Sequence, residues 1–155
     1  MFFNVVAAFL TVAIGLIPAN AETHTVTFTN RCGYGTPYLR AENGAVLSTG
    51  GAYTSNGPLI GAIAYLQTGN CGNNGEGCTL VETTLENGRS STDISLVYPH
   101  EFHVTSGFGY YGGCDGAGAD CKSADCGTAF HHSGDTWVQV GCSANNENLA
   151  ITFCD

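Results

Sequence analysis

The chain has 155 residues, and thirteen acidic residues against four Lys and Arg give it a formal net charge of -9. This excess of negative charge argues against nucleic acid or an anionic membrane as a partner, because both repel an acidic surface. Twenty-two glycines and a charged fraction of only 11% indicate many turns and short strands, and hence an all-β protein.

The first 21 residues are predicted to be a secretory signal peptide. Residues 1–17 contain no charged side chain, and Ala19-Asn20-Ala21 is an A-x-A cleavage site. The apolar run is short for a membrane span. We therefore expect a secreted monomer, outside the cell or in the cell wall, with one domain over residues 22–155.

In the first half of this domain, the hydrophobic pattern predicts short strands. Residues 24–30, HTVTFTN, place Val26 and Phe28 on one face, as in a half-buried antiparallel strand. The apolar run LIGAIAYLQ is only nine residues long and contains a Gly, which favours buried strand over helix. That run is the strand predicted at residues 59–67, and further strands are predicted at residues 36–40, 45–48 and 52–54.

A hairpin is predicted over residues 79–97. Asn87-Gly88 favours a type I′ turn, and a fold about that pair places Glu82 opposite Asp93. Two carboxylates in such a pair, with Cβ atoms ~5 Å apart, repel each other, so selection for stability alone would avoid them. They are either two solvated acids on an open sheet face or part of a functional site. The opposite face, which can be buried, carries Val81, Leu85, Ile94 and Leu96.

Strands are also predicted in the last third, over residues 101–105, 136–140 and 148–153. Residues 106–126 are rich in Gly and hold three cysteines, which indicates a disulfide-stapled loop. Its aromatic side chains either pack or form a sugar-stacking surface, whereas Trp137, in an alternating strand, is expected in the core. These loop aromatics are Phe108, Tyr110 and Tyr111. The whole pattern predicts an antiparallel β-sandwich or barrel.

The eight cysteines all follow the signal peptide, and an even number there predicts a disulfide framework. Four bridges allow about a hundred connectivities, so the spacing does not decide the pairing. Cys71 and Cys78 flank the loop GNNGEG and are the favoured local pair. Zinc-type C-x2-C spacing is absent.

No metal or other cofactor is predicted. Asp115 and Asp120 are too sparse for the known calcium loop pattern. His100 and His103 fall on opposite faces of their predicted strand, so they cannot share a metal ion.

Several segments resemble, in the same order, the thaumatin-like family, in a short form of fungal type. These segments are TVTFTNRCGY near the start, TLVETTL and TDISLV in the hairpin, FHV after it, GGCDG, and ITFCD at the end. The resemblance implies a flattened β-sandwich with disulfide-held loops and an acidic cleft. It also implies the disulfides Cys32–Cys154 and Cys71–Cys78, and for the remaining cysteines we assign the pairs Cys114–Cys142 and Cys121–Cys126.

The resemblance carries a reduced set of cleft residues onto this chain. Glu82 and Asp93 match the family's Glu and one of its Asp residues, but Gln67 stands where the family has an Arg. A further Asp is missing because a stretch between Cys78 and Thr79 is absent.

The implied function is binding of a polysaccharide such as β-1,3-glucan, with a defence, antifungal or cell-wall role. The predicted ligand-binding residues are Gln67, Phe108, Tyr110 and Tyr111. A weak endo-β-1,3-glucanase is one alternative, with Glu82, its pKa raised by a neighbouring carboxylate, as acid and Asp93 as its partner. A non-catalytic secreted effector or inhibitor is the other.

Overall fold

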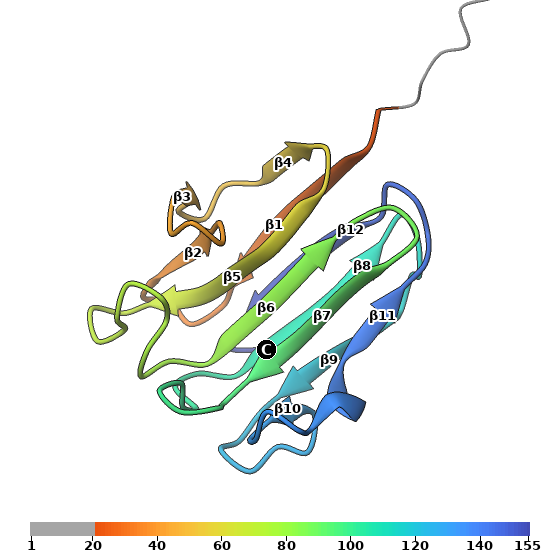
Figure 1. Ribbon diagram of the computed structural model, residues 1–155. Helices are drawn as coiled ribbons and strands as arrows, with labels where there is room; N and C mark the ends of the chain where they lie inside the picture. Colours follow the sequence, from red (N-terminus) through yellow and green to blue (C-terminus); the bar gives the residue numbers. More distant parts are fainter. Residues whose placement is uncertain (1–20) are drawn as a thin grey trace, which may run out of the picture.

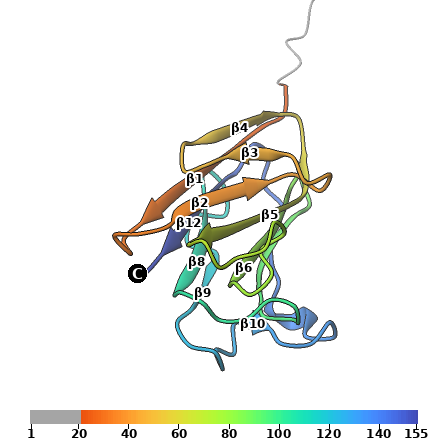
Figure 2. The same ribbon diagram turned by 90° about the vertical axis from the view of Figure 1, so that its left-hand side faces the viewer.

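The computed structural model describes residues 21–155, which form two β-sheets packed face to face (Figures 1 and 2). The predicted signal peptide lies outside the described residues, apart from Ala21. The five-stranded sheet has the order β4 (Tyr53–Asn56), β1 (Thr23–Asn30), β12 (Asn148–Phe153), β8 (Ser106–Tyr111) and β9 (Gly118–Cys121).

The seven-stranded sheet has the order β10 (Ala129–Phe130), β7 (Ser90–Ser95), β6 (Leu80–Leu85), β5 (Leu59–Gln67), β2 (Thr36–Arg40) and β3 (Val46–Ser48). Its seventh strand, β11 (Val140–Cys142), pairs with β7. One short 3-10 helix, η1 (Thr136–Val138), precedes β11. Within residues 21–155, no helix is long and apolar enough to cross a bilayer. The predicted disulfide-stapled β-sandwich is the observed architecture.

The hydrophobic core lies between the two sheets. In each strand the alternate side chains that point inward are buried, as in Val81 and Ile94 of the seven-stranded sheet and Leu149 and Ile151 of the five-stranded one. A sheet that buries only one face leaves its other face free for function.

The two ends of the described chain lie side by side. β1 and β12 pair in parallel, with Val26 beside Leu149, and Cys32 is bonded to Cys154 just beyond them. The C-terminus accordingly lies next to the end of β1 (Figure 2). The four disulfides are those predicted, and no cysteine among the described residues is free. They are Cys32–Cys154, Cys71–Cys78, Cys114–Cys142 and Cys121–Cys126.

Glu22, the residue that follows the expected cleavage site, is tied to the fold. Its carboxylate accepts a hydrogen bond of 2.6 Å from the Asn87 amide and lies 3.0 Å from the ring of the buried His24. These hydrogen bonds lower the pKa of Glu22. The N-terminal residue of the expected mature chain thus anchors β1 to the tip of the β6–β7 hairpin.

The register of this hairpin is as predicted, with Glu82 beside Asp93 and Thr84 beside Ser91. The turn differs from the prediction. Gly88 has a φ of 82°, whereas Asn87 is not among the non-glycine residues with positive φ. A positive φ at only the second central residue is the pattern of a type II turn, not of type I′. Both turns span two residues, so the facing pairs are the same.

The prediction that residues 106–126 form a disulfide-stapled loop is wrong for its first part, because residues 106–111 form strand β8 inside a sheet. Phe108 and Tyr110 point into the core and are only 5% and 3% exposed. The Tyr110 hydroxyl lies 2.9 Å from Thr92 Oγ1 of the other sheet, and burial raises the pKa of Tyr110 to about 12. These two rings are therefore core side chains, and their expected role in sugar stacking is corrected. Tyr111, half-buried, points away from the core.

Two further predictions for the last third are wrong. Residues 101–105 form no strand, and residues 136–138 form the 3-10 helix, so that the expected strand starts only at Val140. As a result Trp137, expected in the core, is 76% exposed. A period-2 pattern of five residues does not distinguish a short strand from a turn and a short helix.

Candidate ligand-binding cleft

The β6–β7 hairpin places Glu82 and Asp93 together on the outer face of the seven-stranded sheet. The side chains next to them in sequence, Val81 and Ile94, point into the core, so both acids point outward. Two adjoining cavities, of about 270 and 390 Å³, open on this face, and both are lined by Glu82, Asp93 and Gln139. We call the two together the acidic cleft.

The two halves of the acidic cleft have different walls. The sheet half lies over β5, β6 and β7, and its remaining lining residues are Gly61, Ala62, Ile63, Thr83, Thr84 and Ser91. The loop half lies over the end of β7 and the loops beside it, with Ser95, Val97, Tyr98, Pro99, His100, Phe130 and Ser133. Apart from Ile63, the sheet half is thus made of small and polar residues, whereas the loop half combines polar groups with apolar and aromatic ones.

Asp93 is the most unusual group of the acidic cleft. It is only 7% exposed, Gln139 Nε2 donates to its Oδ2 over 3.4 Å, and its Oδ1 has no hydrogen-bond partner. Burial raises the pKa of Asp93 to about 6, and the negative charge of Glu82 acts in the same direction, against the hydrogen bond from Gln139. A buried carboxyl oxygen without a partner is costly, which suggests that a ligand group satisfies it.

Comparison with known proteins supports the architecture. No family model and no curated protein matches the sequence. The structure matches that of a thaumatin-like xylanase inhibitor with a TM-score of 0.58, over 84% of this chain and 99% of that chain, at 18% sequence identity. The fold is thaumatin-like. Because the identity is so low, the likeness concerns the fold, and function has to be argued from the acidic cleft itself.

In this thaumatin-like fold, the sequence-based assignment of Glu82 as the proton donor needs correction. Glu82 is exposed to solvent, whereas the carboxyl with the clearly raised pKa is Asp93. Below about pH 6 a protonated Asp93 can donate a hydrogen bond, and Glu82 can accept one. Hydrolysis of a glycosidic bond requires carboxyl groups that flank that bond. Neighbours on adjacent strands instead point the same way from one sheet face, an arrangement that suits binding better than cleavage.

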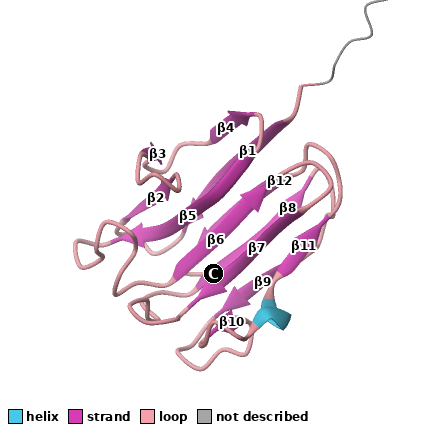
Figure 3. Ribbon diagram, viewed as in Figure 1, coloured by secondary structure: helices cyan, strands magenta, loops and turns pink. Residues whose placement is uncertain are grey.

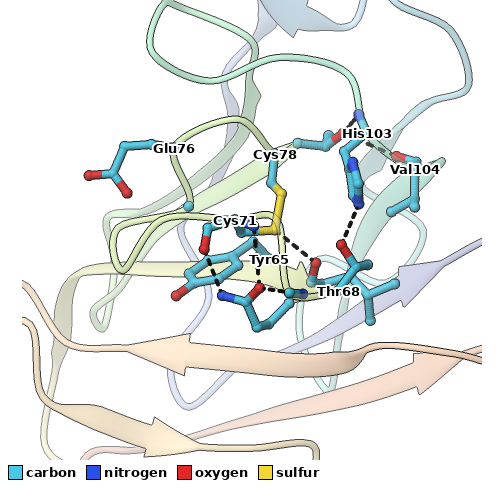
Figure 4. Close-up of a disulfide and its surroundings, with 12 residues drawn as sticks. Tyr65, Thr68, Cys71, Glu76, Cys78, His103 and Val104 are labelled. Carbon is cyan, nitrogen blue, oxygen red and sulfur yellow. Dashed lines mark hydrogen bonds between the residues drawn. A yellow bond between two sulfur atoms is a disulfide. The ribbon is translucent and has the colours of Figure 1, made fainter.

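Gln67, the residue at the expected Arg position, does not line the acidic cleft. Its amide holds the loop after β5: Nε2 donates to the Cys71 carbonyl over 2.9 Å, and Oε1 accepts from the Gly69 amide over 2.8 Å. The expected ligand-binding role is thus replaced by a structural one, because the loop already uses both ends of the side chain. Figure 4 shows this loop and its disulfide.

Beside this disulfide lies the one group of three metal-ligand residue types that the described residues bring within 4.8 Å of one another, namely Cys71, Cys78 and His103. The two sulfurs are bonded to each other, so neither is a thiolate that could bind a metal ion. His103 Nε2 lies 2.8 Å from Thr68 Oγ1 (Figure 4). His103 therefore ties the loop after β5 to the segment after β7, and the cluster is not a metal centre.

Two residues that line the loop half, Gln139 and Tyr98, were not predicted as site residues from the sequence. Gln139 was included in a predicted strand, and its contact with Asp93 joins residues 46 positions apart, which no local pattern reveals. Tyr98 carried a usable signal. It precedes Pro99 at the end of a strand, where the chain is expected to leave the sheet and expose its side chains.

Proposed function

We propose that the protein is a secreted, non-catalytic binder of a neutral polysaccharide of the glucan type, held in the acidic cleft. The observation that carries this proposal is the unpaired Oδ1 of the buried Asp93, at the junction of the two cleft halves. A sugar hydroxyl is a small donor and acceptor of the kind that such an oxygen needs.

The walls of the acidic cleft support this ligand class. Two carboxyl groups at the centre disfavour anionic polysaccharides, and the net charge of the chain acts in the same direction. Val97 and Pro99 offer apolar surface beside Ser95 and Gln139, and sugar rings present both kinds of surface. The sequence resemblance adds β-1,3-glucan as the first candidate, with a defence, antifungal or cell-wall role.

Sedimentation with insoluble β-1,3-glucan tests the proposal. We expect the protein to sediment with the glucan without releasing reducing sugar. Glu82→Gln should weaken binding about 3- to 10-fold, because Gln keeps a hydrogen-bond acceptor but loses the charge that strengthens the bond. Asp120→Asn is the matched control, because Asp120 is an exposed acid on the five-stranded sheet. Sugar release by the wild type that Glu82→Gln abolishes would establish the glucanase alternative. Absence of sedimentation would refute glucan binding.

A second candidate is suggested by the likeness to the thaumatin-like xylanase inhibitor: this chain would bind a polysaccharide hydrolase instead of the polysaccharide. Measuring the rates of an endo-xylanase and an endo-β-1,3-glucanase with increasing amounts of the protein separates the two. If the chain binds only polysaccharide, we expect the xylanase rate on a short soluble substrate to stay unchanged. Inhibition that saturates at a stoichiometric amount would favour the inhibitor.

A further inference from the structure

Two large aromatic side chains are left exposed on the part of the molecule that holds the loop half of the acidic cleft. Tyr98 is 93% exposed and Trp137 is 76% exposed, more than any other large hydrophobic residue described. Tyr98 lines the loop half. Trp137 does not itself line that half but lies beside it, in η1, two residues before the lining residue Gln139. Figure 3 shows η1 beside β10, whose Phe130 lines the same half. Burial of such side chains would stabilise the protein, so their exposure in one region calls for a ligand.

We infer that Tyr98 and Trp137 are aromatic platforms that stack on the sugar rings of a neutral glucan chain, which runs from the Glu82–Asp93 pair along the loop half. This inference rests on the proposed function and specifies which half of the cleft binds and through which residues. The apolar C–H face of a pyranose ring packs on an aromatic ring. The hydroxyls at its edge then reach polar groups such as Asp93 and Gln139. The sheet half offers no aromatic side chain.

The backbone that carries Tyr98 is held in place before any ligand arrives. The His100 amide donates to the Val97 carbonyl over 2.9 Å and closes a turn around Tyr98. The Pro99 carbonyl accepts a 2.8 Å hydrogen bond from the Gly77 amide, and His100 Nδ1 lies 3.0 Å from the Gly75 carbonyl. Gly75 and Gly77 belong to the loop that the Cys71–Cys78 disulfide closes. This disulfide therefore braces the Tyr98 turn, and a braced site loses less entropy on binding.

The segment that carries Trp137 is held in a similar way. Asp135 Oδ2 accepts hydrogen bonds from the His131 and His132 amides, at 3.0 and 2.9 Å. The Val138 amide donates to the Asp135 carbonyl over 3.1 Å. The indole thus stands on an ordered turn, although the ring itself is exposed.

Trp137 is the one tryptophan of the chain, so its intrinsic fluorescence reports on this site alone. We expect soluble β-1,3-glucan oligosaccharides to shift the emission of Trp137 to shorter wavelength, because stacking on a sugar ring removes water from the indole. Tyr98→Ala and Trp137→Ala should each weaken oligosaccharide affinity about tenfold by titration calorimetry. Tyr34→Ala should leave the affinity unchanged, because Tyr34 is 56% exposed but precedes β2, which β5 and β6 separate from β7 and its flanking loops.

The outcomes distinguish this inference from the proposed function. If the wild type binds and Glu82→Gln weakens binding, while Tyr98→Ala and Trp137→Ala bind like the wild type, the aromatic platforms are refuted and the acidic cleft stands. If the wild type shows neither heat nor a change in fluorescence with any glucan, both are refuted. Thermal unfolding of each variant excludes misfolding, and since both rings are exposed we expect melting temperatures close to that of the wild type.

Discussion

Asp93→Asn is expected to raise the free energy of unfolding at pH 7.5 by about 2–3 kcal/mol. The pKa of Asp93 is about 6 in the folded protein against 3.8 for the unperturbed group. Each pKa unit corresponds to about 1.4 kcal/mol. At neutral pH the folded state must therefore hold a charge that its surroundings disfavour. Asparagine has the same shape without the charge, and it can still accept the hydrogen bond from Gln139.

The stability gained by Asp93→Asn is expected to depend on pH. Because the folded-state pKa is raised, the folded protein binds a proton more tightly than the unfolded chain, so the contribution of Asp93 to stability falls as pH rises from about 4 to about 6. Well below the unperturbed pKa of 3.8 the group is neutral in both states, so no charge is buried and the destabilisation is absent. The advantage of Asp93→Asn should thus be near zero at pH 4 and complete above about pH 6.

Urea unfolding of the wild type and Asp93→Asn at several pH values between 4 and 7.5 measures this difference. Asp120→Asn, which removes the charge of an exposed acid on the other sheet, is the control. Equal stability of Asp93→Asn and the wild type at pH 7.5 would mean that water or a counter-ion already satisfies Asp93. The structural argument for a ligand at Oδ1 would then fail. A stabilising substitution is instead the behaviour of a residue kept for function at a cost in stability.

Loss of the Cys32–Cys154 disulfide is expected to have the largest effect on stability. These cysteines are 122 residues apart in the sequence, and closing so long a loop restricts the unfolded chain most. In the chain-entropy model Cys32→Ser with Cys154→Ser costs about 5 kcal/mol. That is a large part of the total stability of a protein of this size. The β1–β12 pair that the disulfide joins should also open more readily, because both ends of the chain are then free.

The Cys121→Ser, Cys126→Ser variant is the matched comparison, because its cysteines are only five residues apart. The same model predicts a loss of about 2 kcal/mol for this shorter loop. Thermal and urea unfolding, with amide hydrogen exchange of β1 and β12, measure both effects. Equal losses for the two variants would contradict the loop-length argument and would point to strain or residual structure in the unfolded state.

The sequence predictions were correct where the structure depends on interactions between nearby residues, and wrong where it depends on packing between distant segments. The pairing of Glu82 with Asp93 depends on a two-residue turn and on the alternation of side chains, both local, and the register is as predicted. Phe108 and Tyr110 were misplaced because their Gly-rich surroundings resemble a loop. Their glycines instead lie in a strand between β12 and β9. Trp137 was misplaced for the opposite reason, since the alternation around it is typical of a strand.

The residue pattern alone determined the all-β class and the facing carboxylates, because turn residues and period-2 alternation act over short distances. The number of cysteines predicted a disulfide framework, but the pairing of distant cysteines such as Cys32 and Cys154 came only from the family resemblance. Only the tertiary structure decided which acid is buried. Asp93 is buried and accepts a hydrogen bond from Gln139, 46 residues away, while Glu82 on the neighbouring strand stays exposed. It also decided which aromatics are accessible, since burial depends on what the rest of the chain packs against each ring, and that contact is not encoded in the neighbouring residues.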